Sequence, residues 1–257
     1  MASPDPDLPP DLDRIVLDHM ARHRSVRRFS GAPLADSDLA DAVRAAQMAA
    51  TSSWVQAYSL VRVRDAAERA TLAELTGGQP QVANAGAFLV VCADVRRHRL
   101  VAERAGRPLA RNLEAFLVAV IDAALFAQNL ALALEAQGHG ICFIGGLRND
   151  STAVDALLEM PSDVFPLFGL CAGEAAEDDA HVTRPRLPLE AVLGDGRYPN
   201  DERVLAAVDA YDAEVAEHYK ARGKSGYTWT GGLVRRLERP LRTHLAAYYT
   251  AKGATLE

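Results

Sequence analysis

Cysteine is scarce in this chain of 257 residues, and its three cysteines lie far apart, each within an apolar run. They are Cys92, Cys142 and Cys171. An odd number of isolated cysteines excludes a disulfide framework and indicates reduced thiols in buried strands, as is usual in a cytosolic protein. The chain also lacks CxxC and HExxH motifs, so no segment has the ligand spacing of a zinc site.

Positive charge is in deficit, with 28 lysines and arginines against 34 aspartates and glutamates, a formal net charge of -6 and a sequence pI near 5.7. A protein whose main partner is nucleic acid needs a basic surface to neutralise phosphates. The composition therefore argues against nucleic acid as the main partner.

Several familiar functional segments are also missing. Residues 1–11 are acidic and rich in proline, unlike a signal peptide, and are predicted to be a disordered lead. No G-x-G-x-x-G follows a strand and no G-x-S-x-G elbow occurs, while Gly223-Lys224-Ser225 follows a helix, which excludes a P-loop. These absences favour a cytoplasmic globular protein without these nucleotide-binding or hydrolase motifs.

Against this acidic background, residues 23–29 (HRSVRRF) concentrate three arginines, a histidine and a serine. In an extended segment alternate side chains point to opposite faces, so His23, Ser25 and Arg27 are predicted to share one face. Arginine binds phosphate oxygens bidentately, and histidine and serine add short donors. The segment is either a phosphate site or a solvated basic loop.

Two other polar clusters also allow two interpretations. The hydroxyls of Thr51 and Ser52 either satisfy the end of a helix or line a polar ligand. Gly145 and Gly146 form either a plain strand-to-helix turn or a place where backbone approaches a flat ligand closely. Gln79 projects directly from the glycine-rich turn that ends a helix.

Hydrophobic periodicity predicts alternating helices and strands. The predicted helices span residues 12–20, 36–50, 65–76, 112–137 and 201–221, and the strands 56–64, 88–93, 141–144 and 164–172. Pro166 places the last strand near an edge or a bulge. Residues 96–108 are predicted to be an exposed, mobile, basic loop, and the tail to residue 257 to be helical with a break at Pro240.

The helix over 112–137 is apolar on almost every side. Asp122, Gln128 and Asn129 lie near its middle and would be costly in hydrocarbon, so the helix is not expected to cross a membrane. A helix buried on every side in so small a protein indicates a subunit interface.

Seven motifs, in order along nearly the whole chain, resemble the nitroreductase superfamily, in particular its oxygen-insensitive NADPH nitroreductase and flavin reductase branch. They are HRSVRRF, the hydroxyl cluster at 51–54, TGGQ, FIGGLRN, PLFGLCAGE, RPRLP and YKARG. The resemblance implies an α+β fold with a mixed, mostly antiparallel sheet wrapped by helices. It also implies a homodimer that exchanges C-terminal segments and holds one FMN per subunit between the two chains. The expected division is a core over 12–200 and a helical extension over 201–257.

The resemblance also implies the site residues. The phosphate and ribityl side of FMN would be held by His23, Arg24, Ser25, Val26 and Arg27, joined by Arg184, Pro185 and Arg186. The ribityl chain or the flavin edge would meet Thr51, Ser52 and Gln79. The isoalloxazine would lie along Phe143, Ile144, Gly145 and Gly146.

Arg222 matches the family's NADPH-phosphate arginine, and Lys224 lies beside it. The chain departs from the family pattern at Arg184, where relatives carry lysine, and after Arg222, where the loop is shorter and a second arginine is missing. NADPH, or NADH in its place, would therefore be the reductant.

The implied activity is two-electron, ping-pong reduction of a small acceptor, namely a nitroaromatic, a quinone or free flavin. Because the flavin carries the hydride, no catalytic side chain and no metal are expected. Two alternatives stay open on the sequence alone. One is a specialised flavoenzyme of the same superfamily, dehalogenase-like or biosynthetic; the other is a non-catalytic regulator that binds phosphate or nucleic acid.

Overall fold

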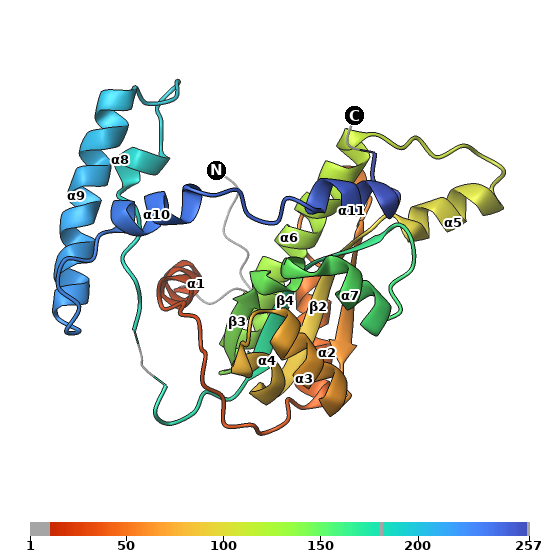
Figure 1. The fold of residues 1–257 in the computed structure, drawn as a ribbon, viewed down its shortest axis with the longest axis horizontal. Coiled ribbons are helices and arrows are strands. Elements are labelled where there is room, and N and C mark those ends of the chain that lie inside the picture. The colour runs from red at the N-terminus through yellow and green to blue at the C-terminus, as the bar shows by residue number, and fades with distance from the viewer. Residues whose placement is uncertain (1–10, 180–181, 256–257) are drawn as a thin grey trace. The chain divides into compact units, whose positions relative to one another are not determined.

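The computed structural model describes residues 11–179 and 182–255 (Figure 1). By its internal contacts the chain divides into two compact units, one formed by Met1–His181 with Arg242–Glu257 and the other by Val182–Leu241. The disordered lead predicted for residues 1–11 falls outside the described residues except for Asp11, which precedes helix α1 (Leu12–Ala21). The functional boundary expected after residue 200 remains a prediction.

The first unit is built on a four-stranded sheet in the order β1-β2-β4-β3, with antiparallel pairing between all neighbours. The strands are β1 (Tyr58–Val63), β2 (Ala87–Asp94), β3 (Gly140–Ile144) and β4 (Val164–Gly173). A parallel bridge between Ser25 and Ile141 adds the mixed component. The predicted α+β fold with a mixed, mostly antiparallel sheet is confirmed.

Helices cover both faces of this sheet, because successive strand side chains point to opposite sides. Leu89 and Val91 pack with α2 (Asp36–Ala46), α6 (Leu113–Ala136) and α11 (Leu245–Ala251). Phe88 and Val90 pack with α3 (Ala66–Leu75), α4 (Pro80–Asn84) and α7 (Ser151–Leu157) on the other face. Every residue of β2 is buried, as a central strand requires.

Helix α6 differs from its prediction in one respect. Its length and composition would suit a membrane span, but it packs against β1, β2, β3 and α2 as the core helix of the first unit. Within the single chain it is not buried on every side, because Leu117, Ile121 and Leu125 are exposed along one face. One apolar stripe of α6 thus serves the core and another faces outward.

Residues 96–104 form helix α5 (Arg96–Arg104), so the predicted loop over 96–108 is wrong for most of its length. The sequence RRHRLVAER has few apolar residues, but arginine, leucine, alanine and glutamate all favour a helix. Arg99 Nη1 donates to Glu103, one turn along the helix, at 2.7 Å, and Arg99 Nε donates to the distant Asp163 Oδ2 at 2.7 Å. Local propensity and a tertiary contact thus both support the helix.

Three local features complete the description of these elements. Asp65 and Asp150 cap α3 and α7 through their side chains. Helix α2 ends at Ala46, earlier than predicted, and no side chain caps its start; residues 52–54 form a separate 3₁₀ turn, η1 (Ser52–Trp54). Pro166 lies in an inner strand and not at an edge, at the bulge where the β2–β4 register shifts.

The second unit contains α8 (Leu189–Val192), α9 (Asp201–Lys220) and α10 (Trp229–Leu237). Tyr211 of α9 packs edge-on against Trp229 with ring centroids 5.7 Å apart, and Asp212 accepts the Thr230 N–H at 2.9 Å. These contacts join α9 to α10. The long charged helix predicted for 201–221 is confirmed.

Candidate functional site

The basic segment lies along the free edge of β3. The Val26 N–H donates to the Ile141 carbonyl at 2.8 Å, and the Val26 side chain is only 2% exposed. Gly140 permits this approach, because a Cβ there would stand 2.5 Å from Val26 Cγ2. The backbone of β3 therefore fixes the extended conformation that the alternation argument assumed.

Asp179, just beyond β4, holds the same segment from the other side. It forms an ion pair with Arg24, and its Oδ1 accepts the N–H groups of Arg27 at 3.3 Å and Arg28 at 3.2 Å. Burial by itself would raise the pKa of Asp179, but these hydrogen bonds outweigh burial and hold the pKa below its usual value. Arg24 and Val26 thus also hold the segment in place, while His23, Ser25 and Arg27 share the face predicted to meet a ligand.

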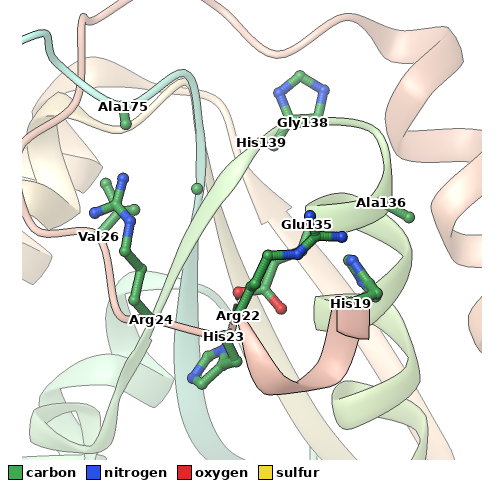
Figure 2. A pocket seen from close by; sticks show the side chains of 11 residues that line it. His19, Arg22, His23, Arg24, Val26, Glu135, Ala136, Gly138, His139 and Ala175 are labelled. Carbon is green, nitrogen blue, oxygen red and sulfur yellow. Dashed lines mark hydrogen bonds and ion pairs between the residues drawn. The ribbon is translucent and has the colours of Figure 1, made fainter. Parts of the chain in front are cut away.

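A cavity of about 430 Å³ opens beside the start of β3 (Figure 2). Its polar lining comes from the end of α1, the start of the basic segment, the last turn of α6 and the residue before β3: His19, Arg22, His23, Arg24, Glu135 and His139. Two arginines and three histidines thus surround one carboxylate. A cavity with this lining suits an anionic group.

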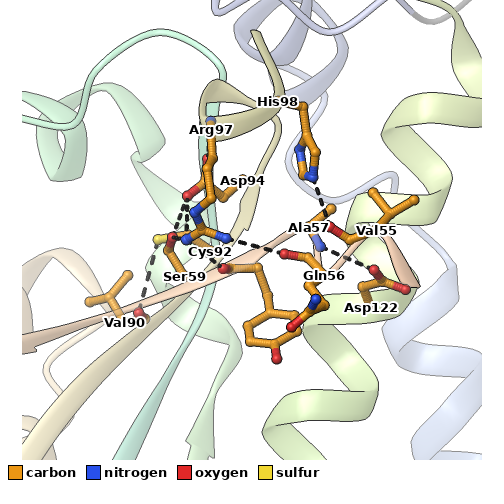
Figure 3. Close-up of polar contacts among 11 residues, drawn as sticks. Val55, Gln56, Ala57, Ser59, Val90, Cys92, Asp94, Arg97, His98 and Asp122 are labelled. Atoms are coloured by element: carbon orange, nitrogen blue, oxygen red, sulfur yellow. Dashed lines mark hydrogen bonds and ion pairs between the residues drawn. The ribbon is translucent and has the colours of Figure 1, made fainter. Parts of the chain in front are cut away.

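The loop over 51–57 is held by α6. Asp122, fully buried in mid-helix, accepts the Ser52 N–H at 3.0 Å and the Ala57 N–H at 3.1 Å (Figure 3). Between these anchors Ser53, Trp54 and Gln56 all adopt positive φ angles, of 46°, 59° and 54°. Such backbone strain in non-glycine residues often clusters at functional sites.

Helix α5 holds the same loop from the outside. The Arg97 guanidinium donates to the carbonyls of Gln56 at 3.3 Å and Tyr58 at 3.4 Å, and His98 Nε2 lies 2.8 Å from the Val55 carbonyl. Figure 3 shows these bonds converging on the strand entry. Helix α5, which was predicted to be a loop, therefore holds residues 55–58 in place through these hydrogen bonds.

The two glycines after β3 have different surroundings. A Cβ at Gly146 would stand 2.3 Å from the Thr76 carbonyl oxygen and 2.7 Å from Gln79 Nε2, so the close approach there is to the chain itself. At Gly145 the nearest atom would be an Arg148 nitrogen at 3.6 Å. The absence of a side chain at Gly146 is thus required by its own neighbours, and Gly145 is the open position; contact of either glycine with a flat ligand stays a prediction.

Several predicted residues are brought together along β3. The bridge at Ser25 and Ile141 lies about 13 Å from Gly145 along the strand. Between them Ile144 is buried and Phe143 is 37% exposed, and Gln79 lies beside Gly146, its Nε2 donating to the Thr76 carbonyl at 2.8 Å. One edge thus carries cations at one end and an open glycine at the other.

Thr51 and Ser52 do not join this edge within the chain. Their loop enters β1, at the opposite edge of the sheet from β3, and is bonded to α6. The second unit, which is described by itself, contains the remaining predicted residues: Arg184, Pro185, Arg186, Arg222 and Lys224. There the Tyr211 hydroxyl donates to the Pro185 carbonyl at 3.0 Å, and Arg222 Nη1 to the His218 carbonyl at 2.6 Å.

Burial raises the Tyr211 pKa, and the positive charges of Arg186 and Arg184 oppose that shift. Burial lowers the His218 pKa, with further lowering by Arg222 and Arg184. Both pKa shifts require Arg184, and the Tyr211 shift also Arg186, to lie near α9. The second unit therefore gathers cations around one stretch of that helix.

Sequence reasoning missed the carboxylates that position the site. Asp179 and Glu135 were not singled out, and Asp122 was used only to exclude a membrane. A signal was present for two of them, because Asp122 and Glu135 interrupt an otherwise apolar helix. A buried acid must find donors, so such an interruption indicates a partner segment.

The other reactive side chains of the described residues do not form a second centre. All three cysteines are free and buried, and burial raises the pKa of Cys92 to about 12, which keeps it protonated. Among the residues described, no group of three histidine, cysteine or acidic side chains could hold a metal ion.

Comparison with known proteins identifies the architecture. The Nitroreductase family pattern matches residues 20–174, and that of its C-terminal domain matches residues 184–257. The chain belongs to the nitroreductase family. It is 39% identical to "FMN reductase (NADPH)" of Bacillus subtilis, over 93% of this chain and 97% of that protein.

Two further relatives extend the comparison. "Oxygen-insensitive NADPH nitroreductase" of Salmonella typhimurium is 38% identical over 93% of this chain and 97% of its own. The solved structure of the NfrA1 nitroreductase from B. subtilis superposes with a TM-score of 0.89 at 38% identity, covering 93% of this chain and 98% of that one. These matches confirm the nitroreductase-like fold inferred from the seven motifs.

We expect the two glycines of this nitroreductase to respond differently to alanine. Gly146→Ala should lower the free energy of unfolding by about 1–3 kcal/mol, because the Thr76 carbonyl cannot move away without shifting the turn. Gly145→Ala should change it by less than about 0.5 kcal/mol. Urea denaturation measures both, and equal losses would contradict the difference in surroundings.

The depressed pKa of Asp179 predicts a pH-dependent stability. Its stabilisation should be present above the unfolded carboxyl pKa, about 3.9, and be lost as pH falls through the lower folded pKa. Asp179→Asn should therefore cost about 1–3 kcal/mol near pH 7 and much less near pH 3. The neighbouring, exposed Asp178 pairs with Arg28, and Asp178→Asn is the control, with an expected change below about 0.5 kcal/mol. A loss for Asp179→Asn that does not vary with pH would refute the assignment.

Proposed function

We propose that the chain is an FMN-dependent NAD(P)H oxidoreductase that transfers two electrons, by a ping-pong route, to a small acceptor such as a nitroaromatic, a quinone or free flavin. The observation that carries this proposal is the edge of β3, with its cations beside Ser25 and its open backbone at Gly145. The names of the B. subtilis and S. typhimurium relatives support it.

The residues on this edge fit FMN. His23, Ser25 and Arg27 offer donors to its phosphate and ribityl chain, next to a cavity lined by cations. Phe143 and Gly145 leave an apolar, unobstructed surface for a flat ring. Gln79 retains one amide hydrogen for the ring edge, since its Nε2 donates once, to the Thr76 carbonyl, and its Oε1 accepts from Gln81.

FMN, when bound, supplies the hydride chemistry for both half-reactions. The chain contributes position and electrostatics. Arg27 brings a permanent positive charge that favours the anionic form of a reduced flavin over the neutral oxidised form. The half-exposed Phe143, which packs edge-on against Phe168 at 5.5 Å, gives the nicotinamide and the acceptor an apolar border.

A homodimer accounts for two features that one chain leaves open. The exposed apolar stripe of α6, formed by Leu117, Ile121 and Leu125, is the kind of surface that a partner covers. Thr51 and Ser52 lie at the other edge of the sheet from Gly145, so they would reach the flavin of the partner subunit. Exchange of the C-terminal segments, over 201–257, is part of the same proposal, as is a cytoplasmic location.

The nicotinamide substrate would use the second unit. Arg222 and Lys224 flank Gly223 at the end of α9, where exposed cations can meet the 2'-phosphate of NADPH. Tyr219 and Tyr227 lie close by, with ring centroids 4.2 Å apart. Because Arg222 also donates to the carbonyl of His218, its guanidinium is held at this end of the helix.

The purified protein should be yellow, and its flavin should depend on Arg27. Charge-assisted bonds to phosphate are worth about 1.5–3 kcal/mol, so Arg27→Ala and Arg186→Ala should each weaken FMN binding about tenfold or more. Arg28→Ala is the matched control, because Arg28 is exposed and pairs with Asp178. A colourless protein, or an FMN affinity that is equal in all variants by fluorescence titration, would contradict the proposal.

Dimerisation should depend on the outward stripe of α6. Ile121→Asp places a charge in that stripe and should shift the sedimentation mass at micromolar concentration from two chains toward one. Leu100→Asp, on the exposed side of α5, should leave the mass unchanged. A wild-type mass of one chain would contradict the homodimer.

Arg222 should set the preference for NADPH. We expect a modest preference, roughly ten- to hundredfold in kcat/KM and weakened by salt, because the loop is exposed and its second arginine is missing. Arg222→Ala should reduce kcat/KM for NADPH and spare NADH, whereas Lys220→Ala, whose ammonium pairs with Glu217, should change neither. Equal losses with both nucleotides would mean that Arg222 only stabilises the helix end.

A further inference from the structure

Helix α6 carries only three ionisable side chains in 24 residues, and the last of them is in an unfavourable place. Glu114 lies exposed in the first turn, where a carboxylate complements the helix dipole, but Glu135 lies in the last turn, where the dipole opposes it. The Glu135 side chain is also only 12% exposed. A buried carboxylate at this position needs a partner to be retained.

Its partner is the first residue of the basic segment. His23 Nδ1 lies 2.7 Å from Glu135 Oε1, which makes this one of the shorter side-chain bonds at the cavity. The second oxygen, Oε2, is buried and bonded to no other described residue. Among the described residues, the Glu135 carboxylate therefore forms a hydrogen bond only to His23.

The bond fixes the direction of the imidazole. An ionised carboxylate only accepts, so Nδ1 is the donor, and the other ring nitrogen points away from Glu135. No described residue is bonded to Nε2, while His23 lines the cavity together with Arg22 and Arg24. With Nδ1 held by Glu135, Nε2 is the ring atom left to meet an anionic group bound in the cavity.

We propose that Glu135 is a positioning residue for the phosphate of FMN, acting through His23. The inference rests on the proposed FMN site and adds to it the residue that orients its histidine. Carboxylates behind metal-binding histidines act in the same way, and their loss typically costs 10–100-fold in affinity. Glu135 would thus link α6, which carries the outward apolar stripe, to the phosphate end of the cofactor.

The cavity contains a second histidine–carboxylate pair that serves as a control. His139 Nε2 lies 3.2 Å from Asp38 Oδ2, but Asp38 is 42% exposed and His139 is outside the basic segment. Breaking this pair changes a carboxylate beside the same cavity without touching His23. Asp38→Asn should therefore leave flavin binding unchanged.

The test compares FMN with riboflavin, which lacks only the phosphate. Dissociation constants are measured by fluorescence titration of the flavin-free full chain for wild type, Glu135→Gln, Glu135→Ala, His23→Ala and the double variant His23→Ala/Glu135→Ala. Glu135→Ala should weaken FMN about tenfold and leave riboflavin unchanged. In the His23→Ala background it should cause no further loss, because the partner through which it acts is absent.

Glu135→Gln keeps the shape of the side chain and removes its charge, so it should show the same selective loss even if the alanine variant folds poorly. Unchanged or tighter FMN binding in Glu135→Gln, equal losses for FMN and riboflavin, or an undiminished loss in the His23→Ala background would each overturn the inference. A wild-type chain that binds neither flavin would instead refute the FMN site itself.

Discussion

Asp122 has no contact with solvent, and its two carboxylate oxygens accept the N–H groups of Ser52 and Ala57. An unpaired charge at this depth would cost several kcal/mol, so the loop must follow a path that brings both donors to it. The strained residues between the anchors, from Ser53 to Gln56, show what that constraint imposes on the backbone. The rest of the candidate site is organised in the same way, by buried acids that hold loops.

Asp179 and Glu135 apply this constraint to the basic segment. Asp179 accepts from Arg24 and from two backbone N–H groups, and Glu135 accepts from His23. An acidic protein can thereby hold a dense cluster of arginines in one conformation without a bound anion, because Arg24 and Arg28 already have carboxylate partners, Asp179 and Asp178. His23, Ser25 and Arg27 are then ordered before any ligand arrives, which lowers the entropy cost of binding.

Helix α6 combines three roles that its composition makes compatible. Its alanine-rich inner face lets β1, β2 and β3 approach closely, its two buried acids hold the loops, and its outer leucines and isoleucine remain exposed for a partner. In the proposed dimer, one helix would therefore carry both the subunit contact and the acids that hold the candidate site.

The sequence by itself determined the family, the positions of the motifs and most of the helices and strands, because hydrophobic period, glycine positions and the seven collinear motifs are all local signals. It correctly indicated the four strands, the long helices α6 and α9 and the extended path of residues 23–28. Only the tertiary structure decided what lies against each motif. Helix α5 is anchored by Asp163 and by the carbonyls of Gln56 and Tyr58, which accept from its arginines, and Gly146 is required by the Thr76 carbonyl, not by open space. The burial of Glu135 against His23, 112 residues away, could not be read from either segment, since a side chain's partner depends on how the chain folds back on itself.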